Sequence, residues 1–273
     1  TTTIRMQRVR LRVTPQATIQ IDSLRGRMVP TRRGEPPYFD DPTSFRIALA
    51  SAAMAVDAAS LTALMNDCLR RHREVPLRDV RVSAREGELR QKGTLEKGPG
   101  MSFEIRARPQ VGPGGVLLLR PSKVKAGGVP VKGLMRVFGI EMESVLDLQG
   151  ACGLTTEGNA LLLDPGALAP PPAMTGTLTG VEVLEDRLAL RFGKPPEESG
   201  SAKQTGYMDF RGGTLRFGKL TMHDTDLRLI DTDPEDPFEF YLERYLDQLV
   251  VGTSKTTKQK GLRTYLPDYG DLR

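Results

Sequence analysis

Tryptophan is absent from this 273-residue chain, and histidine and cysteine occur only twice each. A Ser-His-Asp or Cys-His catalytic site would therefore have to use His72 or His223. His72 follows arginines at the end of an expected helix, and His223 and its neighbour Asp224 would point to opposite faces of a strand. No HExxH, GxSxG or Walker motif occurs. The sequence therefore predicts a protein that is not an enzyme and has no catalytic residues.

Long apolar runs are missing as well. No window reaches about 18 uninterrupted apolar residues, so we expect no segment that spans a bilayer as a helix. Hydrophobic residues make up 38% of the chain, which favours a half-solvated, β-rich protein over a large α/β enzyme. The chain starts at Thr1 without an initiator methionine, which leaves room for a leader or anchor removed before Thr1.

The positive charge is concentrated at the N-terminus. Residues 1–33 contain eight arginines against the single acid Asp22, within a chain of net charge +5. One interpretation is contact with anionic lipid headgroups or with nucleic acid, and the other is the solvent face of an edge strand. Nucleic acid is disfavoured because no aromatic-rich strand resembles a base-stacking platform. The candidate headgroup or membrane contacts are Arg5, Arg8, Arg10 and Arg12.

The two cysteines, Cys68 and Cys152, lie far apart, and neither belongs to a CxxC pair. This spacing gives little support to a zinc or dithiol site, and we expect no metal ligand here. Cys68 falls on the apolar stripe of an expected helix, where a buried thiol is common. A disulfide between the two cysteines is the alternative.

Alternating apolar residues and turn residues predict an antiparallel meander between two amphipathic helices. The first helix covers residues 60–73 with Ser60 as its N-cap, and the second covers 131–147. Thr62, Asn66 and three charged residues take the polar side of the first helix. The expected strands are 4–29 (one or two strands), 44–56, 79–86, 88–96, 101–111 and 115–125, followed by the hairpin 174–184 and 187–193.

A C-terminal region follows the linker 194–206. We expect strands near 207–211, 214–222 and 226–231, and then a third helix over 237–250. The acidic run from Asp231 to Asp236 has two interpretations. Its alternating acids suggest a calcium loop, but Leu242 stands where the bidentate glutamate should be. The simpler interpretation is a solvated turn that caps the third helix through Asp236.

The predicted fold class is α+β. A long, curved antiparallel sheet wraps around two amphipathic helices, and a C-terminal extension of strands and a helix packs onto it. The expected domain organisation is a basic N-terminal strand or arm (1–43), a core (44–193), a linker (194–206), and a C-terminal β-hairpin, helix and tail (207–273).

Residues 52–193 resemble the LmeA-type bacterial phospholipid-binding family, whose fold is similar to the TULIP lipid-binding domains. The resemblance is one of pattern, order and turn chemistry. The segments that carry it are AMAVDAASLTALMND, PLRDVRVSAREGELRQKGTLE, MSFEIRARPQVGPGGVLLLRPSKVKAGGVPV, GLMRVFGIEMESVLD and LLLDPGALAPPPAMTGTLTGVEVLEDRLALRFG.

This resemblance implies a TULIP-like, non-catalytic lipid-binding protein of the bacterial envelope, periplasmic or membrane-associated. It would hold phospholipid or similar acyl chains in an apolar groove and need no cofactor other than that lipid. Plain core packing of the same stripes is the alternative. The candidate lipid-binding residues are Leu61, Leu64, Met65, Leu134, Met135, Phe138, Met142 and Val145.

A second functional hypothesis comes from a different class of protein. The chain would be a structural accessory subunit of a larger membrane-associated assembly, its TULIP-like core serving as a building block. Protein partners would then bind the N-terminal arm and the region after residue 194, because extensions without a core of their own often dock on partners.

Overall fold

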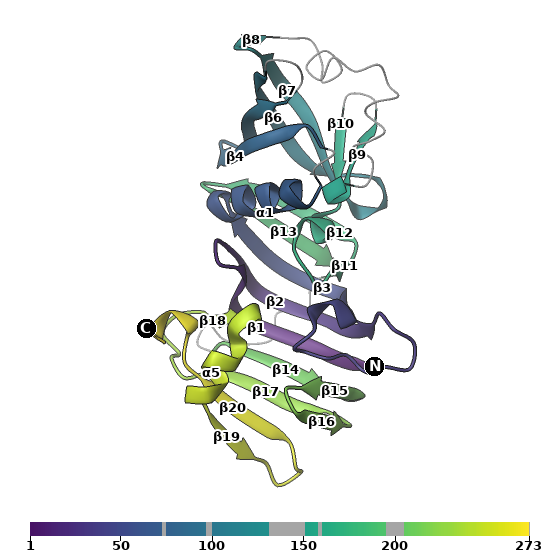
Figure 1. The fold of residues 1–273 in the computed structure, drawn as a ribbon, viewed down its shortest axis with the longest axis vertical. Helices are drawn as coiled ribbons and strands as arrows, with labels where there is room; N and C mark the ends of the chain where they lie inside the picture. The colour runs from purple at the N-terminus through teal and green to yellow at the C-terminus, as the bar shows by residue number, and fades with distance from the viewer. Residues whose placement is uncertain (73–74, 97–99, 131–150, 158–159, 195–204, 273) are drawn as a thin grey trace. The chain divides into compact units, whose positions relative to one another are not determined.

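The computed structural model describes residues 1–72, 75–96, 100–130, 151–157, 160–194 and 205–272. The fold is mostly β, with few helices, and includes an antiparallel sheet that curls into a half-barrel (Figure 1). This confirms the broad expectation of an α+β fold with a curved antiparallel sheet. The predicted helix 131–147 lies outside the described residues, so the wrapping of a sheet around two helices stays a prediction.

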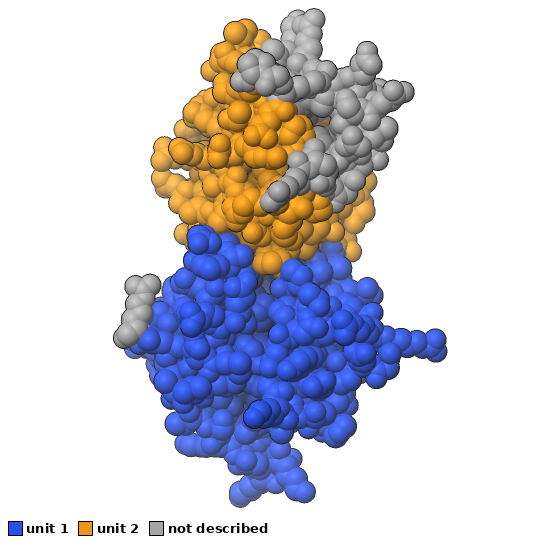
Figure 2. All heavy atoms as spheres, in the orientation of Figure 1, with its two compact units in different colours: residues 1–55, 171–176, 191–273 blue, residues 56–170, 177–190 orange. Residues whose placement is uncertain are grey.

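The chain forms two compact units (Figure 2). Unit 1 contains residues 1–55, 171–176 and 191–273, and unit 2 contains residues 56–170 and 177–190. The N-terminal strands therefore belong to the same compact unit as the C-terminal strands. The middle of the sequence forms the other unit.

Unit 1 is built on a sheet in which β3, β2, β1, β14, β17, β20 and β19 are neighbours in that order. Two short strands pair outside this path, β11 with β3 and β18 with β1, both in parallel. The bounds are β1 Thr2–Thr14, β2 Ala17–Pro30, β3 Phe45–Asp57, β11 Met174–Thr175, β14 Tyr207–Arg211, β17 Asp226–Asp231, β18 Phe238–Tyr241, β19 Thr253–Thr256 and β20 Leu262–Leu266.

The first two strands follow directly from the alternation in the sequence. Ile4 and Met6 are buried, whereas Thr3 and Arg5 between them are exposed, as period-2 alternation requires. β1 and β2 pair antiparallel along almost their whole length, with Thr14 opposite Ala17 at the turn. The expectation of strands over 4–29 is confirmed as two strands.

The core of unit 1 is rich in aromatic rings. Phe39, from the loop between β2 and β3, lies 4.9 Å from Phe217 and 5.0 Å from Tyr245 between ring centroids. Its ring also contacts Phe45 and Phe210. The loop residue therefore belongs to the hydrophobic core, because aromatic pairs at this spacing add to plain area burial.

The predicted helix over 237–250 is wrong in its first half. Residues Phe238–Tyr241 form strand β18, the 3-10 turn η5 (Leu242–Arg244) follows, and only Tyr245–Val251 form the helix α5. Phe238 and Phe240 alternate and are both 0% exposed, and β18 pairs in parallel with β1. Alternating buried aromatics fit a strand, and the partner β1 decides between the two periods. Asp236 therefore does not cap a helix.

The predicted strand 214–222 is also corrected. It is a small hairpin of β15 (Thr214–Phe217) and β16 (Leu220–His223). Gly218 supplies the turn with a φ of 58°, a backbone conformation that favours glycine. The 3-10 turns η1 (Pro42–Ser44) and η6 (Tyr269–Asp271) complete unit 1.

Unit 2 contains the predicted meander. Its sheet has the order β4-β5-β6-β7-β10-β9, with β8 pairing β7, and every pair in it is antiparallel. The four strands expected between residues 79 and 125 are confirmed. The bounds are β4 Leu77–Arg85, β5 Glu88–Leu95, β6 Met101–Val111, β7 Leu117–Ala126, β8 Val129–Pro130, β9 Leu154–Glu157 and β10 Ala160–Leu163, with short helical turns η2 Pro113–Gly115, η4 Ala151–Gly153 and α4 Pro165–Leu168.

The helix α1 spans Ala58–Arg71, close to the expected range. Its N-cap is Asp57 and not Ser60, because the Asp57 Oδ1 accepts a hydrogen bond from the Ser60 amide at 2.6 Å. The helix therefore begins earlier than expected, and Asp57 satisfies a free amide of its first turn. Ser60 is buried in the first turn instead.

The expected hairpin consists of β12 (Leu178–Leu184) and β13 (Arg187–Gly193). Its turn residue Asp186 has a φ of 58° and is hydrogen-bonded on both sides. Its carbonyl accepts from the Ala58 amide at 2.9 Å, and its amide donates to the Ala84 carbonyl at 3.0 Å. The turn therefore holds the start of α1 beside the end of β4.

Candidate functional site

The predicted lipid-binding residues of the first helix are all buried. Leu61, Leu64 and Met65 lie on the inward face of α1. Burial of this face agrees with the helical periodicity that selected it. The other five predicted residues, Leu134, Met135, Phe138, Met142 and Val145, lie outside the described residues. The choice between a groove wall and plain core packing therefore stays a prediction.

The polar side of α1 forms hydrogen bonds with the backbone of β4 that the sequence did not predict. The Asn66 side chain donates to the Val80 carbonyl at 2.6 Å and accepts from the Val80 amide at 3.0 Å. One turn earlier, the Thr62 hydroxyl accepts from the Val82 amide at 2.9 Å. β4 is an edge strand of its sheet, and edge strands have unpaired backbone groups. These two side chains therefore take the place of a neighbouring strand.

A cavity of about 560 Å³ opens at the C-terminal end of α1. This volume is within the range of small-molecule sites. Leu69 and Leu77 supply apolar wall, and Arg78 forms an ion pair of 3.1 Å with Glu96 at the rim. The complete lining is Asn66, Leu69, Arg70, Leu77, Arg78, Asp79 and Glu96. The cavity combines an apolar wall with charges of both signs.

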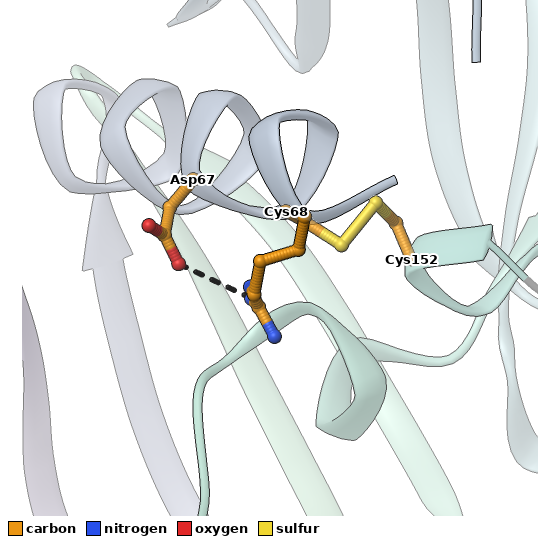
Figure 3. The surroundings of a disulfide bond; sticks show 4 residues. Asp67, Cys68 and Cys152 are labelled. Atoms are coloured by element: carbon orange, nitrogen blue, oxygen red, sulfur yellow. Dashed lines mark ion pairs between the residues drawn. A yellow bond between two sulfur atoms is a disulfide. The ribbon is translucent and has the colours of Figure 1, made fainter. Parts of the chain in front are cut away.

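A disulfide joins α1 to the segment before β9. Cys68 on the buried face of α1 bonds to Cys152 in η4, with 5.7 Å between their Cα atoms (Figure 3). Of the two alternatives that the sequence left open for Cys68, a buried thiol or a disulfide, the structure has the disulfide. The side chain of His72 comes close to both sulfurs, but disulfide sulfurs have no thiolate to offer a metal. Asp67 pairs with Arg71 at 3.2 Å on the exposed side of the same turn.

The four predicted headgroup contacts lie on β1 in unit 1. Arg5 is exposed on the outer face of the sheet. The other three contact the segment 234–239: Arg8 donates to the Pro234 carbonyl at 3.3 Å, and Arg10 lies 3.8 Å from the Asp236 carboxylate. Arg12 donates to Glu239 at 3.0 Å. Intramolecular acids and carbonyls therefore engage three of these four arginines.

Arg5 belongs to a row of five cations and one acid that runs across six strands. Strand register places Arg25, Arg5, Asp209, Arg228, Arg263 and Lys255 opposite one another, in that order, on β2, β1, β14, β17, β20 and β19. We call these six residues the basic row. Burial opposes the ionisation of Asp209, but hydrogen bonds from Arg228 and Arg211 outweigh it and lower the pKa of this carboxyl. The ionised Asp209 offsets one of the five cations, and the row keeps an excess of positive charge.

Two carboxylates of the expected acidic turn lie close to a third from a distant segment. Asp231 at the end of β17, Asp236 just before β18 and Asp268 just after β20 each place a carboxylate oxygen within 4.8 Å of the others. Asp231 and Asp268 are buried. Burial raises the pKa of Asp231 to about 6 and that of Asp268 to about 7, and the neighbouring carboxylates add to the shift. Sequence reasoning found Asp231 and Asp236 but not Asp268, which is distant in the sequence.

The two histidines lie in different environments. His223 is exposed on β16, and its Nδ1 lies 3.3 Å from the Thr214 hydroxyl. His72 is half-buried just after α1, where it ends the helix as C-cap. A charge-relay arrangement needs a carboxylate that orients the imidazole, and the contact of the His223 ring is instead a hydroxyl. Whether the protein is an enzyme stays a prediction.

Among the described residues, no helix is long and apolar enough to cross a membrane. Comparisons with protein-family models, with curated proteins and with solved structures found no match to this chain.

Proposed function

We propose that this chain is a non-catalytic lipid-binding protein of the bacterial envelope, with a TULIP-like unit 2 that holds phospholipid or similar acyl chains. The observation that carries the proposal is the cavity beside α1. It joins the apolar side chains of Leu69 and Leu77 to charged groups of both signs, including Arg70, Arg78 and Glu96. A phospholipid headgroup with a phosphate and an amine would find partners of both signs there.

The energetics of such a site need no reactive residue. Each buried methylene contributes about 0.8 kcal/mol, so an acyl chain is held by burial alone. The antiparallel sheet of unit 2 and the resemblance of residues 52–193 to the LmeA-type family support the same proposal. A periplasmic or membrane-associated location agrees with a lipid ligand and with a disulfide, because structural disulfides persist in oxidising compartments.

Native mass spectrometry of the full chain after mild purification tests the lipid site. We expect a bound lipid with one or two acyl chains. Leu77→Gln should reduce its retention, because the half-buried Leu77 lines the cavity. The matched control is Leu184→Gln, which changes an exposed leucine outside the cavity lining and should leave retention unchanged. A chain without lipid, or equal retention in both variants, would contradict the proposal.

The basic row is the proposed contact with anionic headgroups at a membrane surface. Arg5 and Arg25 are its most exposed arginines, and each cation near an anionic bilayer contributes about 1 kcal/mol. In cosedimentation with vesicles rich in phosphatidylserine, Arg5→Glu and Arg25→Glu should each weaken binding by about fivefold or more. Arg32→Glu makes the same change of charge in the loop after β2 and is the control. An equal loss of vesicle binding in all three variants would show that only the net charge matters, and it would contradict a specific contact through the basic row.

A second candidate function, an accessory subunit of a membrane-associated assembly, is favoured by one observation. α5 exposes Leu246, Val250 and Val251, and Val250 is 84% exposed. Leu246 and Val250 are four residues apart and share one face of the helix. Exposed apolar side chains grouped in this way mark protein interaction sites. A stoichiometric partner in the same native mass spectra, lost on Val250→Lys, would support this function instead.

A further inference from the structure

Three strand ends converge at the carboxylate cluster of unit 1. β17 and β20 run parallel, with Asp231 opposite Leu266, so their carboxyl ends meet at the same edge of the sheet. Asp231 is the last residue of β17, and Asp268 follows β20 by two residues. Asp236 enters from the loop that leads into β18. The topology therefore collects three acids from separate segments at one point.

Asp231, one of the two buried members of this cluster, has a carboxylate oxygen without a hydrogen bond. Asp231 is 2% exposed, and its Oδ1 accepts from the Asp233 amide at 2.9 Å. Its Oδ2 is buried and has no hydrogen-bond partner. A buried carboxylate oxygen without a partner is costly unless it gains a proton or a cation. This oxygen is an observation separate from the clustering of acids, and it indicates a missing ligand.

The positive charge of Arg8 acts on the Asp231 carboxylate, but no basic residue donates a hydrogen bond to its Oδ2. Arg10 reaches the Asp236 carboxylate only at 3.8 Å, and Arg12 bonds to Glu239. Arg8 donates to the Pro234 and Glu235 carbonyls of the loop that carries Asp236. The Asp268 Oδ1 accepts from the Glu239 amide at 2.6 Å, which holds this carboxylate in place. The arginines therefore lie around the loop and leave the Asp231 Oδ2 without a hydrogen bond.

We propose that Asp231, Asp236 and Asp268 form a binding site for a hard divalent cation, with Ca²⁺ as the best fit. Ca²⁺ binds oxygens at about 2.3–2.6 Å, so two of its ligands lie up to about 5 Å apart. One carboxylate oxygen of each aspartate lies within 4.8 Å of those of the other two, which suits this ion. Mg²⁺ has shorter bonds and demands near-octahedral geometry, so it should bind more weakly. Water would complete the coordination, since Asp236 is only half-buried.

The site differs from a contiguous calcium loop. Such a loop takes all its protein ligands from one stretch of about twelve residues. Here Asp268 comes from a distant segment, and Leu242 ligates nothing. The cation would tie the end of β17 to the start of β18 and the end of β20. Binding should therefore stabilise unit 1.

Isothermal titration calorimetry and thermal melts on the full chain test the site at pH 8, after removal of divalent ions with EGTA. We expect one Ca²⁺ per chain and a saturable rise in melting temperature. Mg²⁺ should give a smaller rise at equal concentration. NaCl at matched ionic strength should give none. An equal effect of NaCl, or no heat with Ca²⁺ up to millimolar concentration, overturns the proposal.

Asp231→Asn identifies the ligand without changing the size of the side chain. It should weaken Ca²⁺ binding by at least about tenfold, because even changes outside the ligand set typically cost about 10–100-fold. It should also leave the ion-free protein as stable as the parent or more so, because an amide removes the unpaired buried charge. Asp268→Asn is the second ligand variant, and it keeps the oxygen that accepts from the Glu239 amide.

The matched control is Asp233→Asn, an exposed aspartate of the same loop that is not part of the cluster. It should retain Ca²⁺ binding. Equal loss in Asp233→Asn and Asp231→Asn would show general attraction to an acidic loop and overturn the proposal. Undiminished binding in both Asp231→Asn and Asp268→Asn would do so as well.

Discussion

Asn66 is a polar residue of α1 that bonds to an edge strand. Its amide group pairs with both backbone groups of Val80. We expect Asn66→Ala to lower the free energy of unfolding by about 1–3 kcal/mol, because it leaves partly buried backbone groups without partners. Urea unfolding measures the change. Arg70→Ala, at an exposed position on the same helix, should change stability by no more than about 0.5 kcal/mol.

Glu104 is a second residue whose environment predicts a measurable effect. It is 8% exposed on β6, and Arg90 and Arg106 lie 2.8 Å and 3.1 Å from its carboxylate. The hydrogen bond from Arg90 is the main cause that lowers the pKa of Glu104 to about 2, and Arg106 adds to it. A lowered carboxyl pKa stabilises the fold above the unfolded value near 4.5, and this stabilisation is lost as the pH falls toward 2.

Glu104→Gln should therefore lower stability at pH 7 by about 1–2 kcal/mol, a value reduced for solvent around the half-exposed arginines. The difference between the variant and the parent should shrink as the pH is lowered from 5 to 2. Chemical unfolding at a series of pH values measures it. A difference that stays constant over this range would show that the ionised carboxylate is not its source.

At the scale of elements, the loop between β2 and β3 is anchored by one ring. Phe39 is buried, and its ring contacts Phe45, Phe210, Phe217 and Tyr245. Phe39→Ala should lower the free energy of unfolding by about 3–5 kcal/mol, as truncation of buried aromatics does. Tyr38→Ala, at the preceding and less buried position, should cost clearly less. A similar loss of stability in both variants would show that the Phe39 ring is not the main contact that holds this loop.

The disulfide constrains unit 2 across a separation of 84 residues. The double variant Cys68→Ala, Cys152→Ala should lower stability by about 2–5 kcal/mol, since a cross-link of this length restricts the unfolded chain. Thermal melts of the parent with and without a reductant should reproduce the same direction of change. The double variant itself should not respond to the reductant, which separates the loss of the bond from other effects of reduction.

At the scale of the whole molecule, strands outnumber helices in the described residues of both compact units. Far-UV circular dichroism should show a β-dominated spectrum, with helix in well under a third of the residues. This holds even if the predicted helix 131–147 forms. A helix fraction above a third would contradict the described fold.

Charge is also distributed at this scale. The arginines of β1 lie in two different environments. Arg5 belongs to the basic row, whereas Arg8, Arg10 and Arg12 contact the acidic segment 234–239. The sequence showed a basic start and an acidic stretch near residue 235, but not that they meet. Only the pairing of β1 with β18 brings Arg10 opposite Glu239.

The amino-acid sequence by itself determined the elements whose pattern is local. The alternation of β1 and β2, the meander from β4 to β7 and the buried stripe of α1 follow from side-chain periodicity, because period 2 and period 3.6 select one face for burial. Turn residues such as the Glu185-Asp186 pair mark where these elements end. None of these predictions required knowledge of a distant segment.

Only the tertiary structure decided the features in which two distant segments meet. Phe238–Tyr241 became a strand because β1 offered a partner, although its aromatic spacing also suited a helix. Asn66 bonds to an edge strand, Cys68 pairs with Cys152, and Asp268 joins Asp231 and Asp236. Periodicity encodes which side of an element is buried, but the partner that covers it depends on where the chain returns.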